Sequence, residues 1–395
     1  MTQVLFRGLY ASLLVLAACG KTIDIGSNSA QPGAAIGQCR AAGAPAQVLS
    51  SFAAMPDFTP LSIIIVDGDV YAAGVSYPNR VFDINAADIG RLVRIPASGG
   101  APREVWKGPY LVGVLRAFGS RIAFTETDPN NQVPFPTHGG VDVFDTITER
   151  TIRIPNAAGR DYVASFEIGA DGVFWSGGSL SRVDDAGIGS AKSGYTMARW
   201  RDEATGPEIL LESDSASSFF RRGDEVLANT LLDTASDGKR LAIYHAGSTF
   251  ELEREVHEVS VSGSTATPET LATNGDASFY YLTATLFGGQ QSLRLPRESK
   301  EGTYALQAVS GWAFGAPLVD RGVVLWVPTM DHSMVRRSRL DDASGSAVTG
   351  EEVSLDPRRE IVSLVADDCN VYWLSRSSFD AAEPNRIMVH ARSGP

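Results

Sequence analysis

The residues of this chain that could bind a metal ion or transfer a proton are a few histidines and acidic side chains in expected loops. His138 and His332 stand in turn-rich segments, and Asp128 and Asp331 lie near them in the sequence. Imidazole and carboxylate groups are common metal ligands and general acid–base groups. These four residues are therefore the candidate ligand-binding residues, and the alternative is that all four are solvated loop side chains.

Motifs of the common catalytic sites are absent from the sequence. It contains no P-loop, no Gly-x-Ser-x-Gly, no His-Glu-x-x-His and no Cys-x-x-Cys. The other three histidines, His245, His257 and His390, fall on expected strands, where packing is the usual role. We therefore predict no catalytic residue, no metal site and no cofactor. Whether the chain is an enzyme stays open, because enzymes with repeat folds can assemble their sites from scattered residues.

The first residues of the chain have the pattern of an export signal. Arg7 precedes a short apolar run that is too short to span a membrane comfortably. The run ends in Leu-Ala-Ala-Cys-Gly at 16–20, which resembles the lipobox of bacterial lipoproteins. This resemblance implies cleavage before Cys19 and attachment of lipid to its sulfur. Residues 1–18 are then a signal peptide, and the acyl chains anchor the protein to a bacterial membrane.

The residues that follow Cys19 indicate the destination membrane and a flexible tether, and export of the chain favours a disulfide bond. Gly20 resembles the residue that directs lipoproteins to the outer membrane, although the periplasmic or surface side stays open. Residues 19–43 are small and polar, which favours a flexible tether before a folded domain at 44–395. Export also favours a disulfide between the two remaining cysteines, Cys39 and Cys369.

The elements that would position the loop residues are short strands. Four strand patterns follow one another between residues 61 and 106, joined by turns such as Asp-Gly and Ser-Gly-Gly. Their alternating or continuous apolar character predicts an antiparallel meander. The four expected strands cover residues 61–66, 70–73, 91–95 and 102–106.

The second strand of this meander recurs along the chain. Apolar and aromatic triplets repeat about every 50 residues, with one gap of about three such intervals. Their middle residues are 71, 123, 174, 325 and 372. Repeated four-stranded meanders predict an all-β fold, a β-propeller, most simply of seven four-stranded blades. Six or eight blades stay open, because the second strand within 215–272 can be placed at 226–228 or at 241–244.

The two ends of the chain predict how the ring of blades closes. Residues 386–395 match the third strand and following turn of the first unit, and the chain then stops. Residues 44–49 match the fourth strand of that unit. We therefore expect an N-terminal strand to complete the last blade, with a Cys39–Cys369 disulfide beside it.

Single repeats of this chain resemble those of known exported proteins. The Asp-Gly turn, the Val-Tyr-Trp strand at 371–373 and the Ser-Gly-Gly turn resemble blades of bacterial propellers of the YWTD, NHL and TolB-like type. The YWTD motif itself is incomplete, because Thr-Asp does not follow the tryptophan. The resemblance covers single blades and implies the propeller fold in an exported protein.

The net charge and the lengths of the expected loops limit the classes of function that fit this sequence. The net charge of −12 argues against broad nucleic-acid binding, which needs a basic surface. The loops expected on one face are long, and long loops on a rigid scaffold commonly bind partners. We expect a monomeric, membrane-anchored, non-catalytic binding scaffold for an envelope protein or a glycan. The alternatives are a propeller glycosidase or lyase acting on surface polysaccharide, with two carboxylates about 5–10 Å apart, or an envelope assembly factor with an exposed apolar patch.

Overall fold

The computed structural model describes most strands of the chain and the tighter turns between them. Its described residues are 45–76, 89–109, 111–127, 140–155, 162–180, 191–213, 217–222, 224–234, 238–257, 271–273, 279–284, 291–298, 304–320, 323–328, 334–339, 351–355, 359–367, 369–377 and 383–391. No helix among them is long and apolar enough to cross a membrane.

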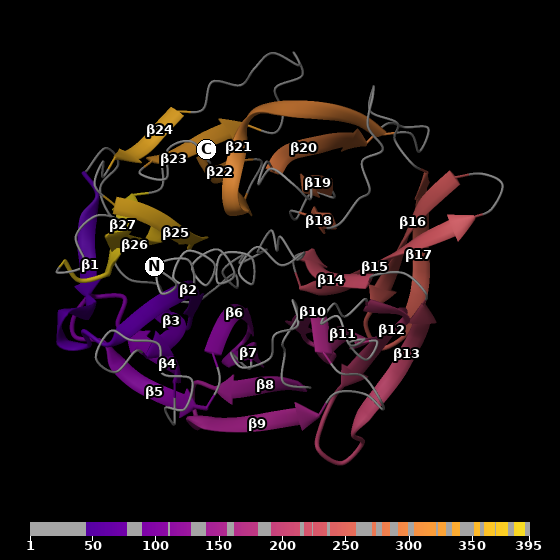
Figure 1. Ribbon diagram of the computed structural model, residues 1–395, viewed down its shortest axis with the longest axis horizontal. Helices are drawn as coiled ribbons and strands as arrows, with labels where there is room; N and C mark the ends of the chain where they lie inside the picture. Colours follow the sequence, from indigo (N-terminus) through magenta and orange to yellow (C-terminus); the bar gives the residue numbers. More distant parts are fainter. Residues whose placement is uncertain are drawn as a thin grey trace, which may run out of the picture.

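The described part is built almost entirely of antiparallel strands (Figure 1). The first sheet contains β2 (Phe58–Val66), β3 (Asp69–Ser76), β4 (Gly90–Ile95) and β5 (Arg103–Gly108). The second contains β6 (Leu111–Phe118), β7 (Arg121–Thr127), β8 (Gly140–Asp145) and β9 (Arg150–Pro155). The third contains β10 (Tyr162–Gly169), β11 (Gly172–Leu180), β12 (Ala191–Trp200) and β13 (Pro207–Ser213). The fourth contains β14 (Ser217–Arg222), β15 (Glu225–Thr234), β16 (Gly238–Ala246) and β17 (Phe250–His257).

A seven-stranded sheet and the last four-stranded sheet follow. The seven-stranded sheet contains β18 (Leu271–Thr273), β19 (Phe279–Ala284), β20 (Gln291–Glu298), β21 (Tyr304–Asp320), β22 (Val323–Pro328), β23 (Met334–Arg339) and β24 (Glu351–Leu355). The last sheet contains β25 (Arg359–Ala366), β26 (Asn370–Ser377), β27 (Arg386–Ala391) and β1 (Gln47–Ser51). A single turn of 3-10 helix, η1 (Phe52–Ala54), follows β1.

The first sheet forms around the tight Asp-Gly turn that the sequence indicates. Asp67 and Gly68 have φ angles of +50° and +80°, as both central residues of a type I′ hairpin turn require. This turn joins β2 to β3, and β3 pairs with β4 and β4 with β5. The meander predicted for residues 61–106 is thus confirmed, with each strand a few residues longer or shifted.

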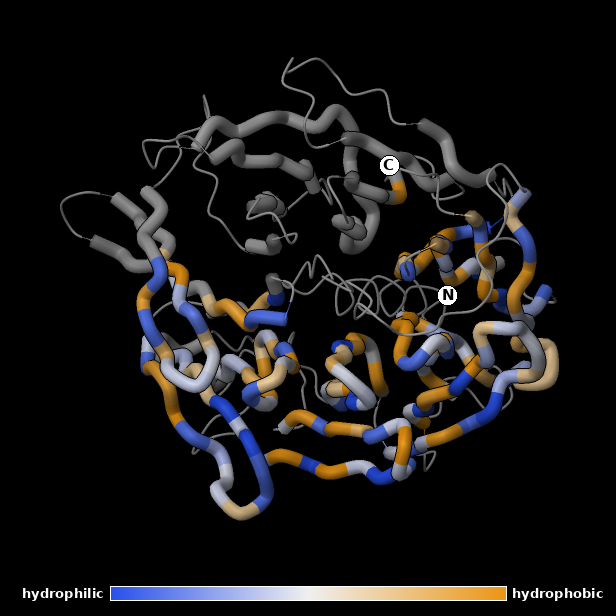
Figure 2. The backbone as a smooth tube through the Cα atoms, turned by 180° about the vertical axis from the view of Figure 1, so that it is seen from behind, coloured by the Kyte–Doolittle hydropathy of each residue, from blue (hydrophilic) through white to orange (hydrophobic). Residues whose placement is uncertain are grey.

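The sheets follow one another around a ring, and the core lies between them. The innermost strands β2, β6, β10, β14 and β18 contact in that order, β21 contacts β25, and β25 contacts β2 (Figure 1). Because neighbouring side chains on a strand point to opposite faces, Trp175 packs towards the second sheet and Phe174 towards the fourth. The outer strands β9 and β13 carry both hydrophilic and hydrophobic residues, and most of these residues are exposed or half-buried (Figure 2).

The long strand β21 joins two successive four-stranded patterns within the seven-stranded sheet. Residues 304–312 of β21 pair with β20, whereas residues 313–320 pair with β22. The number of blades stays a prediction. The ambiguous second strand is resolved in favour of residues 226–228, which lie in β15, because residues 241–244 lie in β16, the third strand of that sheet.

The N-terminal strand completes the last sheet, as the two chain ends predict. Gln47 pairs with Val389 and Ser51 with Arg386, so β1 is the outer strand beside β27. The hydroxyl of Ser50 donates a hydrogen bond of 2.6 Å to the carbonyl of Gly100 in the first sheet. Strand β1 therefore connects the last sheet to the first.

Cys369 lies in the turn between β25 and β26. Its backbone N–H donates a 2.8 Å hydrogen bond to Oδ1 of Asp367. Cys19 and Cys39 lie outside the described residues. The pairing of Cys369 with Cys39 accordingly stays a prediction.

Candidate functional site

The four loop residues singled out from the sequence lie outside the described residues. Asp128 and His138 belong to the segment between β7 and β8, and Asp331 and His332 to the segment between β22 and β23. The described part of the chain contains no group of three or more metal-ligating side chains. His245 lies on β16, with Nε2 3.3 Å from Oε2 of Glu253.

The structure instead brings together charged side chains that sequence reasoning missed. Arg116, Glu167 and Arg221 lie on β6, β10 and β14, the innermost strands of three consecutive sheets. Nε of Arg116 is 3.4 Å from Oε2 of Glu167, and these two side chains are only 7% and 4% exposed. We call the three residues the inner-strand cluster.

Backbone groups and aromatic rings hold the inner-strand cluster in place. Arg116 donates a 2.7 Å hydrogen bond to the carbonyl of Leu115 and lies over the ring of Phe166, 5.7 Å from its centre. Arg221 donates a 2.5 Å hydrogen bond from Nη1 to the carbonyl of Ala117. Arg221 thus reaches from the fourth sheet to the second.

The surroundings of Arg116 change its proton affinity without removing its charge at neutral pH. Burial lowers the pKa of Arg116 to about 10, Glu167 acts in the opposite direction, and Arg221 adds repulsion. Guanidinium groups bind carboxylates through paired, charge-assisted hydrogen bonds. The inner-strand cluster therefore has the chemistry to hold a carboxylate-bearing ligand.

A weak sequence signal could have found two members of the cluster. Ile122 and Val173 occupy the same position in the second strands of their units. Arg116 precedes Ile122, and Glu167 precedes Val173, by the same number of residues. The corresponding residue of the first unit is the fully buried Ile64. A charged residue at a position that is apolar in another repeat marks a candidate site.

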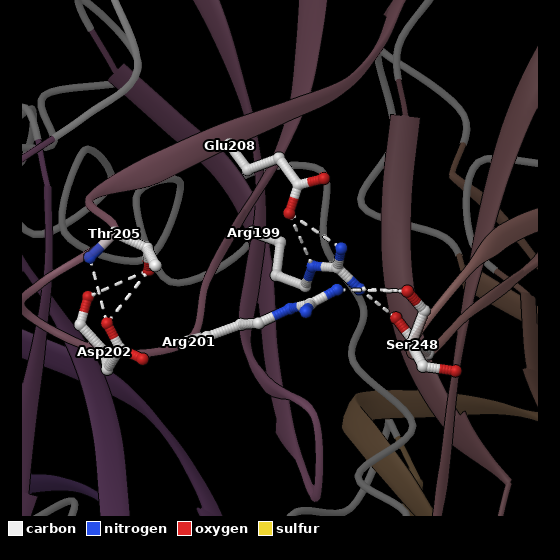
Figure 3. A network of polar contacts seen from close by, with 7 residues as sticks. Arg199, Arg201, Asp202, Thr205, Glu208 and Ser248 are labelled. Carbon is white, nitrogen blue, oxygen red and sulfur yellow. Dashed lines mark hydrogen bonds and ion pairs between the residues drawn. The ribbon is translucent and has the colours of Figure 1, made fainter.

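A second polar network joins the third and fourth sheets near the outside of the ring (Figure 3). Arg199 on β12 donates to Oε2 of Glu208 on β13 at 2.7 Å and to the carbonyls of Gly247 and Ser248 in the turn between β16 and β17. Arg201 donates to the same Ser248 carbonyl at 3.0 Å. This network ties two sheets together and has a structural role.

The fold can be compared with known proteins. No family model and no curated protein sequence matches the chain. Among solved structures, the β-propeller domain of the Trilobed protease from Pyrococcus furiosus matches with a TM-score of 0.52 and 13% identity, over 85% of this chain and 96% of that one. The fold is a β-propeller.

Two acylaminoacyl peptidase structures match the propeller equally well. The Pyrococcus horikoshii enzyme has a TM-score of 0.52 and 12% identity, over 86% of this chain and 53% of that one. An acylaminoacyl peptidase in complex with Z-Gly-Gly-Phe-chloromethyl ketone has 0.53 and 12%, over 87% and 53%. The chain thus spans about half the length of these peptidases, and at this identity the likeness shows the fold alone.

These comparisons correct the functional expectation. A non-catalytic binding scaffold was expected from the long-loop face, yet the similar propellers belong to peptidases. The expectation failed because long loops on a propeller indicate where binding occurs and carry no information on whether a reaction follows. The alternative enzyme, a glycosidase or lyase, differs from these proteins in substrate class.

Proposed function

We propose that this protein takes part in peptide hydrolysis, as a propeller that selects the peptides reaching a hydrolytic centre. The likeness to peptidase propellers over 85–87% of the chain carries this proposal. The inner-strand cluster supports it, because two arginines beside one glutamate suit the terminal carboxylate of a short peptide.

The closure of the ring adds a size limit to the proposal. The Trilobed protease propeller is described as having an open velcro topology. Here β1 pairs with β27, and Ser50 bonds to Gly100 of the first sheet. Separating the first and last sheets would break one of these contacts, because β1 would have to leave either Gly100 or β27. Substrates are therefore short or unfolded peptides that need no such opening.

Replacing Arg221 with glutamine tests the role of the inner-strand cluster. We expect the purified full chain to bind short peptides with a free C-terminal carboxylate, and Arg221→Gln to weaken this binding about tenfold, because a charged hydrogen bond is lost. Calorimetry measures the affinity, and mass spectrometry of the same mixtures detects hydrolysis.

The matched control is Arg103→Gln on the outermost strand β5, where Arg103 pairs with Glu149 at the surface. Arg103→Gln should leave peptide affinity unchanged. As a second control, the wild type should bind peptides with an amidated C-terminus as weakly as Arg221→Gln binds peptides with a free C-terminus. Equal binding of amidated and free peptides would contradict the carboxylate role. Failure to bind or cleave any peptide would contradict the proposed function.

We also propose that Cys19 carries the lipid anchor that holds this activity at a bacterial membrane. The support is the Leu-Ala-Ala-Cys-Gly sequence at 16–20. Cys19→Ala, expressed in a Gram-negative bacterium, should lose incorporation of labelled palmitate and move to the soluble fraction. Cys39→Ala should keep both label and membrane association. A wild-type chain that takes up no label would refute the anchor.

A further inference from the structure

A pair of buried carboxyl groups lies between the first and second sheets. Glu126 is on β7 and Asp142 on β8, and the two residues are 2% and 4% exposed. Asp142 pairs directly across from Phe124, so Glu126, two residues further along β7, is on the same face of the sheet. Diagonal neighbours of this kind are roughly 7–8 Å apart at Cα, within reach of each other's side chains.

In the described part of the chain, the cation beside the carboxyl pair is Arg153, which pairs with Glu126. Arg153 on β9 lies across from Asp142, and its Nη1 donates a 2.8 Å hydrogen bond to Oε2 of Glu126. Burial and the charge of Glu126 raise the pKa of Asp142 and Arg153 lowers it, and together they bring it to about 7.

The side facing the carboxyl pair belongs to β5 of the first sheet. A Cβ atom on Gly108 would lie 2.8 Å from Oε1 of Glu126 and 2.6 Å from the ring of Trp106. The ring of Trp106 packs edge-on against Phe124, 4.8 Å between centres. Lys107, between them in the sequence, projects from the opposite face of β5. Gly108 and Trp106 of the first sheet thus pack closely against Glu126 and Phe124.

One oxygen of Asp142 is especially informative. Its Oδ2 atom is buried and accepts no hydrogen bond. A buried carboxylate oxygen without a partner is costly, whereas a protonated oxygen can donate to a neighbouring carboxylate. Protonation of Asp142 therefore offers a route by which both groups remain buried in this seam.

We propose that Glu126 and Asp142 share one proton and form a pH-sensitive lock between the first two sheets of the propeller. With the proton bound, the seam carries one negative charge, which Arg153 offsets. Loss of the proton to water leaves two like charges in the seam and loosens β7 and β8. This inference is independent of the proposed function.

The sign of the stability effect follows from the folded and unfolded states. In the unfolded chain Asp142 titrates near 3.8, and in the folded chain near 7. Between these values the folded state binds more protons, so stability falls as pH rises from about 4 to about 7 and is level above that. Asp142→Asn, which stays neutral, should remove this loss.

The test compares urea unfolding midpoints of the wild type and Asp142→Asn between about pH 4 and pH 9. We expect the unfolding midpoint of Asp142→Asn to rise relative to that of the wild type as pH increases to about 7. Above pH 7 the difference between the two midpoints should stay constant. The matched control is Asp145→Asn on the same strand. Burial raises the pKa of Asp145, but hydrogen bonds from Thr148 and Ile147 outweigh it and hold the pKa low. Asp145→Asn should instead have a lower unfolding midpoint than the wild type at neutral pH. The difference between them should become smaller as the pH is lowered into the acid range.

A second measurement keeps the proposal testable if Asp142→Asn does not fold. Hydrogen exchange of the wild type, corrected for intrinsic rates, should become faster in β7 and β8 as pH rises from about 4 and should level off above about 7, with β13 unchanged. Glu126→Gln should shift the pH at which exchange levels off to higher values if the amide oxygen accepts a hydrogen bond from protonated Asp142, and to lower values if removal of the like charge dominates. We expect the lower pH, because the charge of Glu126 raises the pKa of Asp142. A shift to higher pH, or an absent transition, would overturn the shared-proton pair.

Discussion

Replacing Leu49 with aspartate is expected to lower the free energy of unfolding by about 4 kcal/mol, because a charge would replace an apolar side chain in a packed seam. Leu49 is 7% exposed and belongs to the core that joins the last sheet to the first. Its neighbours in that core include Phe52, Val389 and Ile63. Loss of this contact would release β1 from β27 and open the ring. Urea denaturation followed by circular dichroism measures the change.

The adjacent residue of the same strand provides the control. Val48 is 48% exposed, because successive side chains of a strand point to opposite sides. Val48→Asp introduces the same charge into the same strand and should change stability by less than about 0.5 kcal/mol. Equal destabilisation by both substitutions would show that β1 is sensitive to charge in general and that Leu49 does not fasten the ring.

Replacing Arg199 with methionine is expected to cost roughly 3 kcal/mol, the second large effect. Methionine fills much of the same volume but cannot donate to Glu208, Gly247 and Ser248 (Figure 3). The Arg199 side chain is only 3% exposed, so water does not readily replace these bonds. The two carbonyl groups of the fourth sheet would lose a buried donor. Thermal and urea unfolding should both show the loss.

Arg201 provides the comparison within the same network. It donates one hydrogen bond to Ser248 from an exposed position. Arg201→Met should therefore cost less than about 0.5 kcal/mol. If Arg199→Met were equally mild, the contact between the third and fourth sheets would depend on apolar packing around Phe174 and Phe219 and on the hydrogen bonds between Ser165 and Phe219.

Much of the fold could be predicted from the sequence, since its repeats are local patterns. The apolar triplets around Tyr71, Ala123, Phe174, Leu325 and Tyr372 all lie in second strands of their units. The pattern around Tyr244 was equally apolar and belongs to a third strand. Both strands of such a pair are buried on two faces, so their composition cannot distinguish them.

The candidate site was less accessible to prediction. Histidines and aspartates in loops drew attention because those residue types commonly bind ligands, yet the described clusters lie on strands. Arg116 on β6 and Arg221 on β14 are far apart in the sequence, and Arg221 comes near Arg116 by donating a side-chain hydrogen bond to the carbonyl of Ala117 on β6. Asp142 lies within an apolar strand, and only pairing with β7 places it beside Glu126.

The sequence by itself determined the all-β class, the strand period and the joining of the two chain ends, because each depends on the alternation of residues along a single strand or on matching two short segments. Only the tertiary structure decided which charged residues share a buried seam. Those contacts depend on strand register and on the packing of neighbouring sheets, and a one-residue change of register would turn Asp142 and Glu126 to the opposite face.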